Sequence, residues 1–251
     1  MATFKDFFSQ QSATYQKYRP TYPAALFVYL ASLTDAHELA WDCGTGNGQA
    51  ARGLVAQYAH VYATDPSAQQ LRQATPHERI TYREEKAEHT SLAAASADLV
   101  TVAQALHWFA FDRFYAGVKR VLKPGGVLAV WTYGLPAVSP EVDRLVQQFH
   151  DQTVGPFWQP ENKWVVQGYT TLPFPFEMLT PPSFRMHRTM TLPDLVGLVA
   201  SWSAVQRFKA QRGFDPVASL AQELAAVWHD PATPWEATWT LILKVGRHTT
   251  T

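Results

Sequence analysis

The chain has 251 residues, of which 47% are hydrophobic and 17% charged, a composition typical of a globular protein with a sizeable core. Lys plus Arg and Asp plus Glu both number 21, so the chain lacks the basic excess with which nucleic-acid-binding proteins neutralise phosphates. The single cysteine, Cys43, excludes an intramolecular disulfide and fits a cytoplasmic location. The first residues lack the pattern of a secretory signal. Asp98 and His107 interrupt the most apolar stretch, 92–111, so no membrane span is expected.

The first half of the chain alternates between short apolar strands and helices. Strands are predicted at 39–43, 61–64, 80–83, 98–103 and 127–131, and helices at 23–33, 49–58, 66–74 and 111–122. The stretch 98–103 is almost continuously apolar, which is typical of a strand buried on both faces of a parallel sheet. This alternation predicts a doubly wound, Rossmann-like α/β sheet with right-handed crossovers.

The second half begins with a segment, 134–183, that is rich in proline and aromatic residues. It is too long for an ordinary connection and predicts a cap over a substrate site. A sixth strand at 184–190, two helices between 193 and 228, and a last strand at 237–245 are expected to follow. We therefore expect a single domain, 1–251, whose parts are an N-terminal helical flap at 1–37, a cofactor-binding core at 38–133, the cap at 134–183, and a C-terminal part at 184–251 that completes the sheet.

The segment Asp42-Cys-Gly-Thr-Gly-Asn-Gly48 directly follows the first predicted strand. Its glycines let the chain turn tightly and let a ligand approach the backbone closely. Asp65 ends the second strand, where an acidic side chain can accept hydrogen bonds from the ribose hydroxyls of an adenosine group. A glycine-rich turn alone is weak evidence, but the turn, Asp65 and the strand order together predict a cofactor that contains adenosine.

Two classes of cofactor could use this arrangement. Dinucleotides prefer the spacing G-x-G-x-x-G, which seats a pyrophosphate on the helix N-terminus, but here Gln49 stands where the third glycine belongs. Asp42 would repel a pyrophosphate, whereas a carboxylate is favourable near a cationic amino acid group and a sulfonium. The charge argument therefore favours S-adenosylmethionine (SAM). A mononucleotide P-loop is excluded because its Lys-Ser/Thr pair is missing.

These segments resemble the class I SAM-dependent methyltransferases over about 39–131. The similar motifs are Asp42–Gly48, Asp65 as the ribose-binding acid, Lys86-Ala-Glu88 beside the adenine, Ala103–Trp108 facing the methionine part and the acceptor, and Arg120-Val-Leu-Lys-Pro-Gly-Gly126 before the fifth strand. The segment Tyr15–Pro23 resembles the branch that includes trans-aconitate methyltransferase and other small-molecule methyltransferases. The resemblance implies a seven-stranded sheet of order 3-2-1-4-5-7-6 with an antiparallel seventh strand, for which 237–245 is the candidate.

The resemblance also implies which residues bind the cofactor. The expected SAM contacts are Tyr15, Arg19, Asp42, Gly44, Thr45, Gly46, Gly48, Asp65, Pro66, Ser67, Ala87, Glu88 and Gln104. Arg19 can hold a carboxylate, of either the cofactor or an acid substrate, although a surface ion pair is the alternative. No metal is expected, because the sulfonium is already an activated leaving group and the histidines lack ligand spacing.

The acceptor is expected beyond the fourth strand, near His107. This histidine can act as a base for a hydroxyl acceptor, although simple packing beside Trp108 is the favoured alternative. Trp108, Trp131 and Tyr133 are candidates to line the acceptor pocket or to belong to the core. A carboxylate acceptor would need no base at all.

The sequence therefore predicts methyl transfer from SAM to a small molecule, with a carboxylic acid as one candidate acceptor. Two alternatives stay open. One is a SAM-binding protein without catalytic activity, and the other, less favoured, is a dinucleotide-dependent oxidoreductase. Neither nucleic acid nor membrane is expected as a partner, and the oligomeric state is left open.

Overall fold

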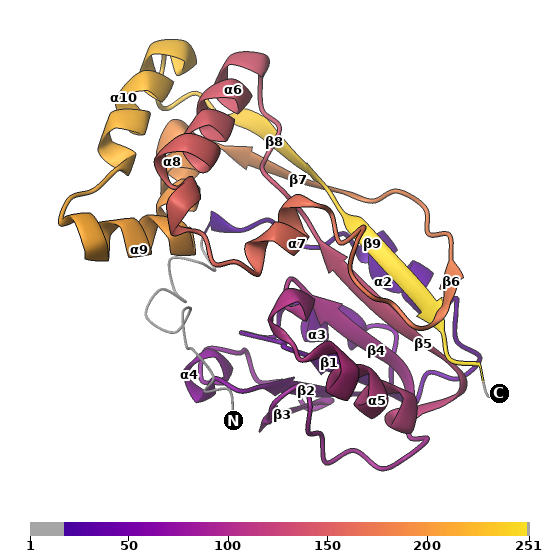
Figure 1. Cartoon of the computed structure of the whole chain (residues 1–251). Coiled ribbons are helices and arrows are strands. Elements are labelled where there is room, and N and C mark those ends of the chain that lie inside the picture. The colour runs from indigo at the N-terminus through magenta and orange to yellow at the C-terminus, as the bar shows by residue number, and fades with distance from the viewer. Residues whose placement is uncertain (1–17, 250–251) are drawn as a thin grey trace.

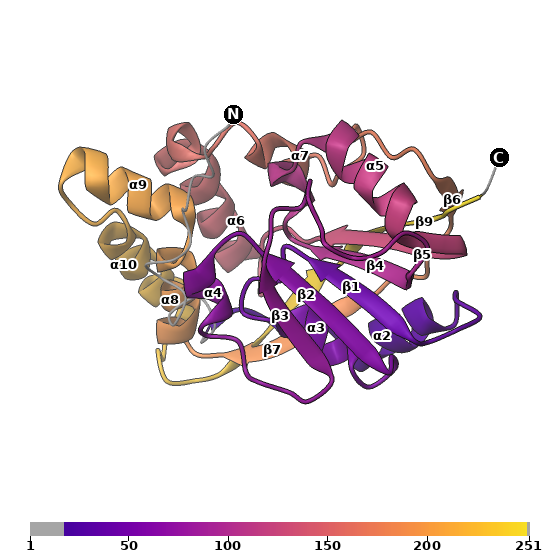
Figure 2. The same cartoon turned by 90° about the horizontal axis from the view of Figure 1, so that it is seen from below.

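The computed structural model describes residues 18–249, and its largest element is a seven-stranded sheet of order β3-β2-β1-β4-β5-β9-β6 (Figures 1 and 2). Its strands are β1 (Leu39–Cys43), β2 (His60–Asp65), β3 (Ile80–Glu84), β4 (Ala97–Ala103), β5 (Leu122–Thr132), β6 (Glu177–Leu179) and β9 (Ile242–Arg247). Strands β1 to β5 are parallel, whereas β9 is antiparallel to both β5 and β6. The predicted order 3-2-1-4-5-7-6 is confirmed, with β9 in the place of strand seven.

Helices cover both faces of this sheet. Helices α2 (Ala24–Ala31) and α3 (Gln49–Leu54) lie on one face, and α5 (Phe111–Val121) lies on the other (Figure 2). Strand β5 shows why a central strand of this sheet is apolar at successive positions. Val127 and Ala129 pack into the core on the α2 side, while Leu128 and Val130 alternate with them into the core on the α5 side.

A buried carboxylate, Asp98, fixes the amino end of the central strands. Its Oδ2 accepts hydrogen bonds from the backbone N–H groups of Glu38 and Leu39 at 2.8 and 2.9 Å, and its Oδ1 lies 2.8 Å from Lys123 Nζ. The Lys-Pro-Gly-Gly turn does not precede the fifth strand as predicted, because β5 already begins at Leu122 and runs through it. Gly126 is required there, since a Cβ would lie 2.9 Å from the carbonyl oxygen of Lys123.

The strands of the C-terminal half differ from the prediction. The stretch expected as strand six forms β7 (Arg185–Met190), but β7 pairs with β8 (Trp235–Thr240) in a separate two-stranded sheet. The sixth position is taken by β6, which has only three residues and is too short to show a periodicity. The single strand expected at 237–245 is two strands, because the chain changes sheets at Leu241, whose N–H donates to the carbonyl of Phe184 at 2.9 Å.

A helical cap stands beyond the carboxyl ends of the parallel strands (Figure 1). The segment 134–183 contributes α6 (Pro140–Gln148), a π-helical turn (Phe149–Thr153) and α7 (Asn162–Val166). Three further helices, where two were predicted, are α8 (Leu192–Ala200), α9 (Ser203–Arg212) and α10 (Val217–Trp228). The cap therefore extends past 183, into the part expected only to complete the sheet. Within 18–249, every helix is too short or too polar to cross a bilayer.

Candidate active site

The loop between β1 and α3 has three glycines with left-handed backbone. Gly44, Gly46 and Gly48 have φ angles of 70°, 57° and 82°, which residues with a side chain rarely adopt. A Cβ at Gly44 would lie 2.7 Å from the Cβ of Ala105, and one at Gly48 would overlap the ring of Tyr82. Among the described residues, a Cβ at Gly46 would meet only one atom, at 3.9 Å. The loop therefore packs tightly at its two ends and is open at Gly46.

Asp42 lies beneath this loop and is completely buried. Its Oδ2 accepts a hydrogen bond from Thr45 Oγ1 at 2.5 Å, and its Oδ1 accepts one from Thr101 Oγ1 at 2.8 Å. Burial raises the pKa of the Asp42 carboxyl to about 6, although both hydroxyl donors partly oppose the rise. Asp42 is thus tied to the loop through the side chain of Thr45.

Asp65 lies at the end of β2, beside the open part of the loop. Its Oδ2 accepts a hydrogen bond from the N–H of Gly46 and its Oδ1 accepts one from the N–H of Ser67, both at 2.9 Å. Ser67 caps the short helix α4 (Ala68–Leu71), so Pro66 precedes the helix and does not occupy its first turn as predicted. Each carboxylate oxygen can accept more than one hydrogen bond.

The segment after β3 approaches the same edge of the sheet. Ala87 is buried among the side chains on the α5 side of the sheet. Glu88 accepts a hydrogen bond from the N–H of Ala110, just before α5, at 2.8 Å. Because the carboxyl ends of parallel strands meet at one edge, the ends of β1, β2, β3 and β4 lie together at the edge where open α/β sheets generally bind ligands.

Gln104 directly follows β4 and has a left-handed conformation with a φ of 56°. Its Oε1 accepts a hydrogen bond from Thr132 Oγ1 at 2.6 Å, and its Nε2 lies 3.4 Å from the carbonyl oxygen of Tyr133. A residue other than glycine persists in this conformation only when its surroundings hold it there, and such residues cluster at functional sites. Gln104 therefore links the ends of β4 and β5 at this edge of the sheet.

His107 is buried, and its Nδ1 lies 2.8 Å from the Oη of Tyr169, which belongs to the cap. Burial lowers the pKa of His107 to about 3, so the ring is neutral at physiological pH. A base with so low a pKa is poorly matched to proton abstraction at neutral pH. The ring of Trp108 packs beside it, with centroids 4.9 Å apart.

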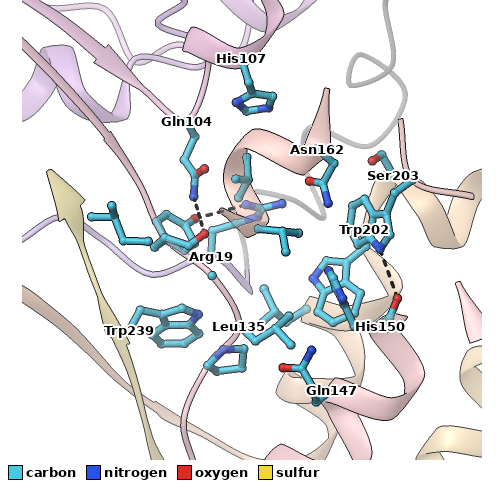
Figure 3. Close-up of a pocket in the computed structure, with 18 of the residues that line it drawn as sticks. Arg19, Gln104, His107, Leu135, Gln147, His150, Asn162, Trp202, Ser203 and Trp239 are labelled. Carbon is cyan, nitrogen blue, oxygen red and sulfur yellow. Dashed lines mark hydrogen bonds between the residues drawn. The ribbon is translucent and has the colours of Figure 1, made fainter. Parts of the chain in front are cut away.

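A cavity of about 580 Å³ opens between the ends of β4 and β5 and the cap (Figure 3). Gln104, His107, Trp108 and Tyr133 line it from the sheet side. Its cap side includes Gln147, His150, Asp151, Trp158, Asn162 and Trp202.

The N-terminal segment reaches this cavity through Arg19, whose Nη1 donates a hydrogen bond to Tyr133 Oη at 3.2 Å. Trp131, by contrast, does not line the cavity as predicted. Its side chain is 0% exposed within the sheet and packs edge-on against Tyr22.

Residues 41–130 match the profile of a family described as "Methyltransferase domain". Two relatives cover most of the chain. A Dictyostelium discoideum protein, named as a putative methyltransferase, is 34% identical over 209 residues, which are 82% of this chain and 80% of the relative. A Mycobacterium tuberculosis protein, named as an uncharacterized methyltransferase, is 32% identical over 206 residues, which are 78% of this chain and 76% of the relative.

A solved structure from Anaeromyxobacter dehalogenans, titled a putative type II methyltransferase, superposes with a TM-score of 0.86 at 42% identity. The superposition covers 93% of this chain and 99% of the Anaeromyxobacter chain. The chain belongs to the class I SAM-dependent methyltransferases. The oxidoreductase alternative is therefore wrong. A more distant structure, a Haemonchus contortus phosphoethanolamine N-methyltransferase with S-adenosylhomocysteine, matches at 15% identity with a TM-score of 0.52, which shows the shared fold alone.

The residues at this edge of the sheet fit the cofactor of this methyltransferase, SAM. With respect to residues 18–249 the loop is open at Gly46, where a ligand can approach the backbone, and the Asp65 carboxylate lies beside it and can accept hydrogen bonds from ribose hydroxyls. Tyr15, a predicted SAM contact, lies outside the described residues. Within 18–249, no group of His, Cys, Asp and Glu side chains is arranged to hold a metal ion.

Several cavity residues were missed as site residues from the sequence: His150, Asp151, Trp202 and Trp239. The density of aromatic residues marked 134–183 as a cap, but no short motif singled out His150. Trp202 and Trp239 lie outside that segment and reach the cavity only through the folding of α9 and β8.

Proposed function

We propose that this methyltransferase acts on a small molecule bound in the cavity between the cap and the ends of β4 and β5. The cavity's volume, about 580 Å³, is the observation that carries this proposal, because it lies in the range of small-molecule sites. Its lining combines aromatic walls with a few polar side chains, as such sites usually do. The even balance of 21 basic and 21 acidic residues disfavours a nucleic acid acceptor.

The acceptor group we propose is a carboxylate. Among the described residues that line the cavity, Arg19 is the one with a permanent positive charge. A guanidinium suits a carboxylate because its planar donors match the two oxygens. Tyr133 accepts a hydrogen bond from Arg19 and so helps hold the guanidinium at the cavity. A carboxylate is ionised at neutral pH and needs no base, which agrees with the low pKa of His107.

When bound, SAM supplies a methyl group on a positively charged sulfur, an activated leaving group that requires no metal. The protein's own contribution is then alignment and exclusion of water. Arg19 would orient the acceptor carboxylate, and the indoles of Trp108 and Trp158 would shield it from solvent. His107 would remain neutral and serve as a packed wall of the site.

For the cofactor we propose that SAM lies across the open part of the loop. The residues that would hold it are Gly44, Thr45, Gly46 and Gly48 in the loop, Asp65, Pro66 and Ser67 after β2, Ala87 and Glu88 after β3, and Gln104 after β4. Asp42 would contribute indirectly, through its hydrogen bond from Thr45. A contact from Tyr15 and kinship with the trans-aconitate branch remain predictions.

The test is release of S-adenosylhomocysteine from SAM in the presence of separate panels of small carboxylic acids, alcohols and phenols. We expect turnover with an acid and a product that mild base hydrolyses, as it does a methyl ester. Arg19→Ala should lose this turnover, whereas Arg185→Ala, an exposed arginine on β7, should keep it. Turnover with alcohols alone would overturn the carboxylate proposal. SAM binding without turnover on any panel would favour the alternative of a non-catalytic SAM-binding protein.

We also propose that the protein works in the cytoplasm. The support for this location is compositional, since the one cysteine, Cys43, is a buried free thiol that a reducing compartment preserves.

A further inference from the structure

A second histidine faces the acceptor cavity, from the cap and far along the chain from His107. His150 lies in the π-helical turn that follows α6, and both His150 and Asp151 line the cavity. Turns of this kind are rare and occur frequently at functional sites. His150 Nδ1 lies 2.7 Å from Asp151 Oδ1, and Gln147 Nε2 donates a hydrogen bond to Asp151 Oδ2 at 2.7 Å.

In the neutral form of His150, these hydrogen bonds fix which ring nitrogen is the donor and which is the acceptor. The donors from His150 and Gln147 lower the pKa of Asp151, so its carboxyl is ionised and can only accept. Nδ1 of the neutral ring must therefore be the N–H, and Nε2 must be the acceptor. In the part of the chain that the structure describes, no residue donates to Nε2, and this nitrogen is not sealed from solvent.

Two indoles hold the ring in an aromatic cluster, with Trp158 tilted by 38° and Trp202 edge-on at 82° to the His150 ring. The centroid of His150 lies 4.9 Å from that of Trp158 and 5.7 Å from that of Trp202, and Trp158 Nε1 donates to the carbonyl of His150 at 3.3 Å. Figure 3 shows His150 and Trp202 on the side of the cavity away from Gln104. Aromatic rings pack well against such clusters, in offset or edge-on contacts.

We propose that His150 selects the acceptor by accepting, at Nε2, a hydrogen bond from a hydroxyl group on an aromatic ring. This inference rests on the proposed function, in which Arg19 binds the carboxylate to be methylated. The acceptor then carries two separate polar groups on a planar body, its carboxylate at Arg19 and its hydroxyl toward the cap. The acceptor class is therefore an aromatic acid that carries a hydroxyl group separate from its carboxylate. His150 is a binding residue, and the methyl group is transferred to the carboxylate.

The experiment uses a matched pair of probes, 6-hydroxy-2-naphthoate and 2-naphthoate, which differ only in the hydroxyl. Calorimetry measures their dissociation constants with the full-length protein saturated with S-adenosylhomocysteine. We expect the wild type to bind the hydroxylated probe about tenfold more tightly, the worth of one hydrogen bond. His150→Phe keeps a ring between the two indoles and should bind both probes equally, with unchanged affinity for 2-naphthoate. His187→Phe, which alters an exposed histidine on β7, is the control and should keep the preference.

Asp151→Ala offers a second route if His150→Phe does not fold, because it removes both acceptor oxygens and with them the contact that fixes the ring's tautomer. It should reduce the preference for the hydroxylated probe without weakening 2-naphthoate. The inference is overturned if the wild type does not prefer the hydroxylated probe, if it binds neither probe, or if the preference survives in His150→Phe. Failure of the proposed function would be distinct, since it would show as absent turnover on the acid panel and no effect of Arg19→Ala on 2-naphthoate.

Discussion

The Nδ1 atom of His107 lies 2.8 Å from the phenolic oxygen of Tyr169, and this contact joins the end of β4 to the cap. Tyr169 is buried and has a left-handed backbone, with a φ of 56°. Burial raises the pKa of Tyr169 well above its usual value and lowers that of His107. Two neutral side chains thus meet where a catalytic base would be sought, and their contact ties the cap to the sheet.

The first prediction is that His107→Gln keeps most of the turnover. A ring with a pKa of about 3 cannot accept a proton efficiently at neutral pH, and a carboxylate acceptor offers none. We expect kcat to change less than about tenfold, whereas loss of a true general base costs about 10²–10⁴-fold. Steady-state kinetics with the acid acceptor measures this. A larger loss in a variant that binds SAM normally would restore His107 as the base.

The second prediction concerns Asp42 and the pH dependence of stability. Its pKa is raised to about 6 in the folded protein from the ordinary 3.8, so between these values the folded state binds the proton more tightly than the unfolded state. Stability from this group therefore falls as pH rises from about 4 to about 6, by roughly 3 kcal/mol in all. Asp42→Asn has no titrating carboxyl at this position, so its stability lacks this dependence on pH. Urea unfolding should show the free energy of unfolding of the variant rising relative to that of the wild type between pH 4.5 and pH 7. A variant-to-wild-type difference that is the same at both pH values would contradict the prediction.

The third prediction separates the cofactor role of Gly46 from its backbone role. An alanine there adopts a left-handed backbone at a cost of about 1 kcal/mol and also narrows the side from which SAM would approach. Gly46→Ala should therefore weaken SAM binding by more than it lowers stability. Gly213→Ala is the matched control, because Gly213 has a φ of 78° with nothing within 4 Å and lies at the end of α9. Equal SAM affinity in both variants would remove Gly46 from the site.

Much of the core and the loop could be predicted, because strong local signals encode them. The apolar run of β4 is typical of a strand covered on both faces, and three closely spaced glycines are typical of a tight turn. The cap site could not be predicted in this way. His150 becomes a site residue only when α6 ends in a π-helical turn opposite β4, and that arrangement depends on packing. The sequence leaves Trp131 open between the pocket and the core, because an apolar residue inside a strand and one just past its end look alike in sequence, and the structure places it in the core.

The fourth prediction tests Asp65 as the ribose-binding acid. Asp65→Ala should weaken SAM binding by about 1–3 kcal/mol, the range for a hydrogen bond to a charged group. Part of this loss would come from the loop, since the Asp65 carboxylate also accepts the N–H of Gly46. Asp98→Asn is the control at the opposite end of the sheet, where the ion pair with Lys123 supports the fold. It should lower thermal stability and leave SAM affinity unchanged. Asp65→Ala with wild-type affinity, measured by calorimetry, would exclude the ribose role.

The last prediction concerns the partner of the Arg19 guanidinium. If Arg19 binds the acceptor carboxylate, Arg19→Ala should raise the KM for the acid by at least about tenfold, because a hydrogen bond to a charged group contributes about 1.5–3 kcal/mol. The dissociation constant for SAM should then stay constant. If the guanidinium instead holds the carboxylate of the cofactor's methionine part, the affinity for SAM should fall. The KM for the acid should then rise only because less enzyme has SAM bound. Tyr133→Phe removes the hydroxyl that accepts a hydrogen bond from Arg19 at 3.2 Å. It should change the same quantity as Arg19→Ala, either the KM for the acid or the dissociation constant for SAM, but by a smaller factor. If Arg19→Ala and Tyr133→Phe change the same quantity, Arg19 and Tyr133 act together. If Arg19→Ala changes neither the KM for the acid nor the affinity for SAM, Arg19 has only a structural role.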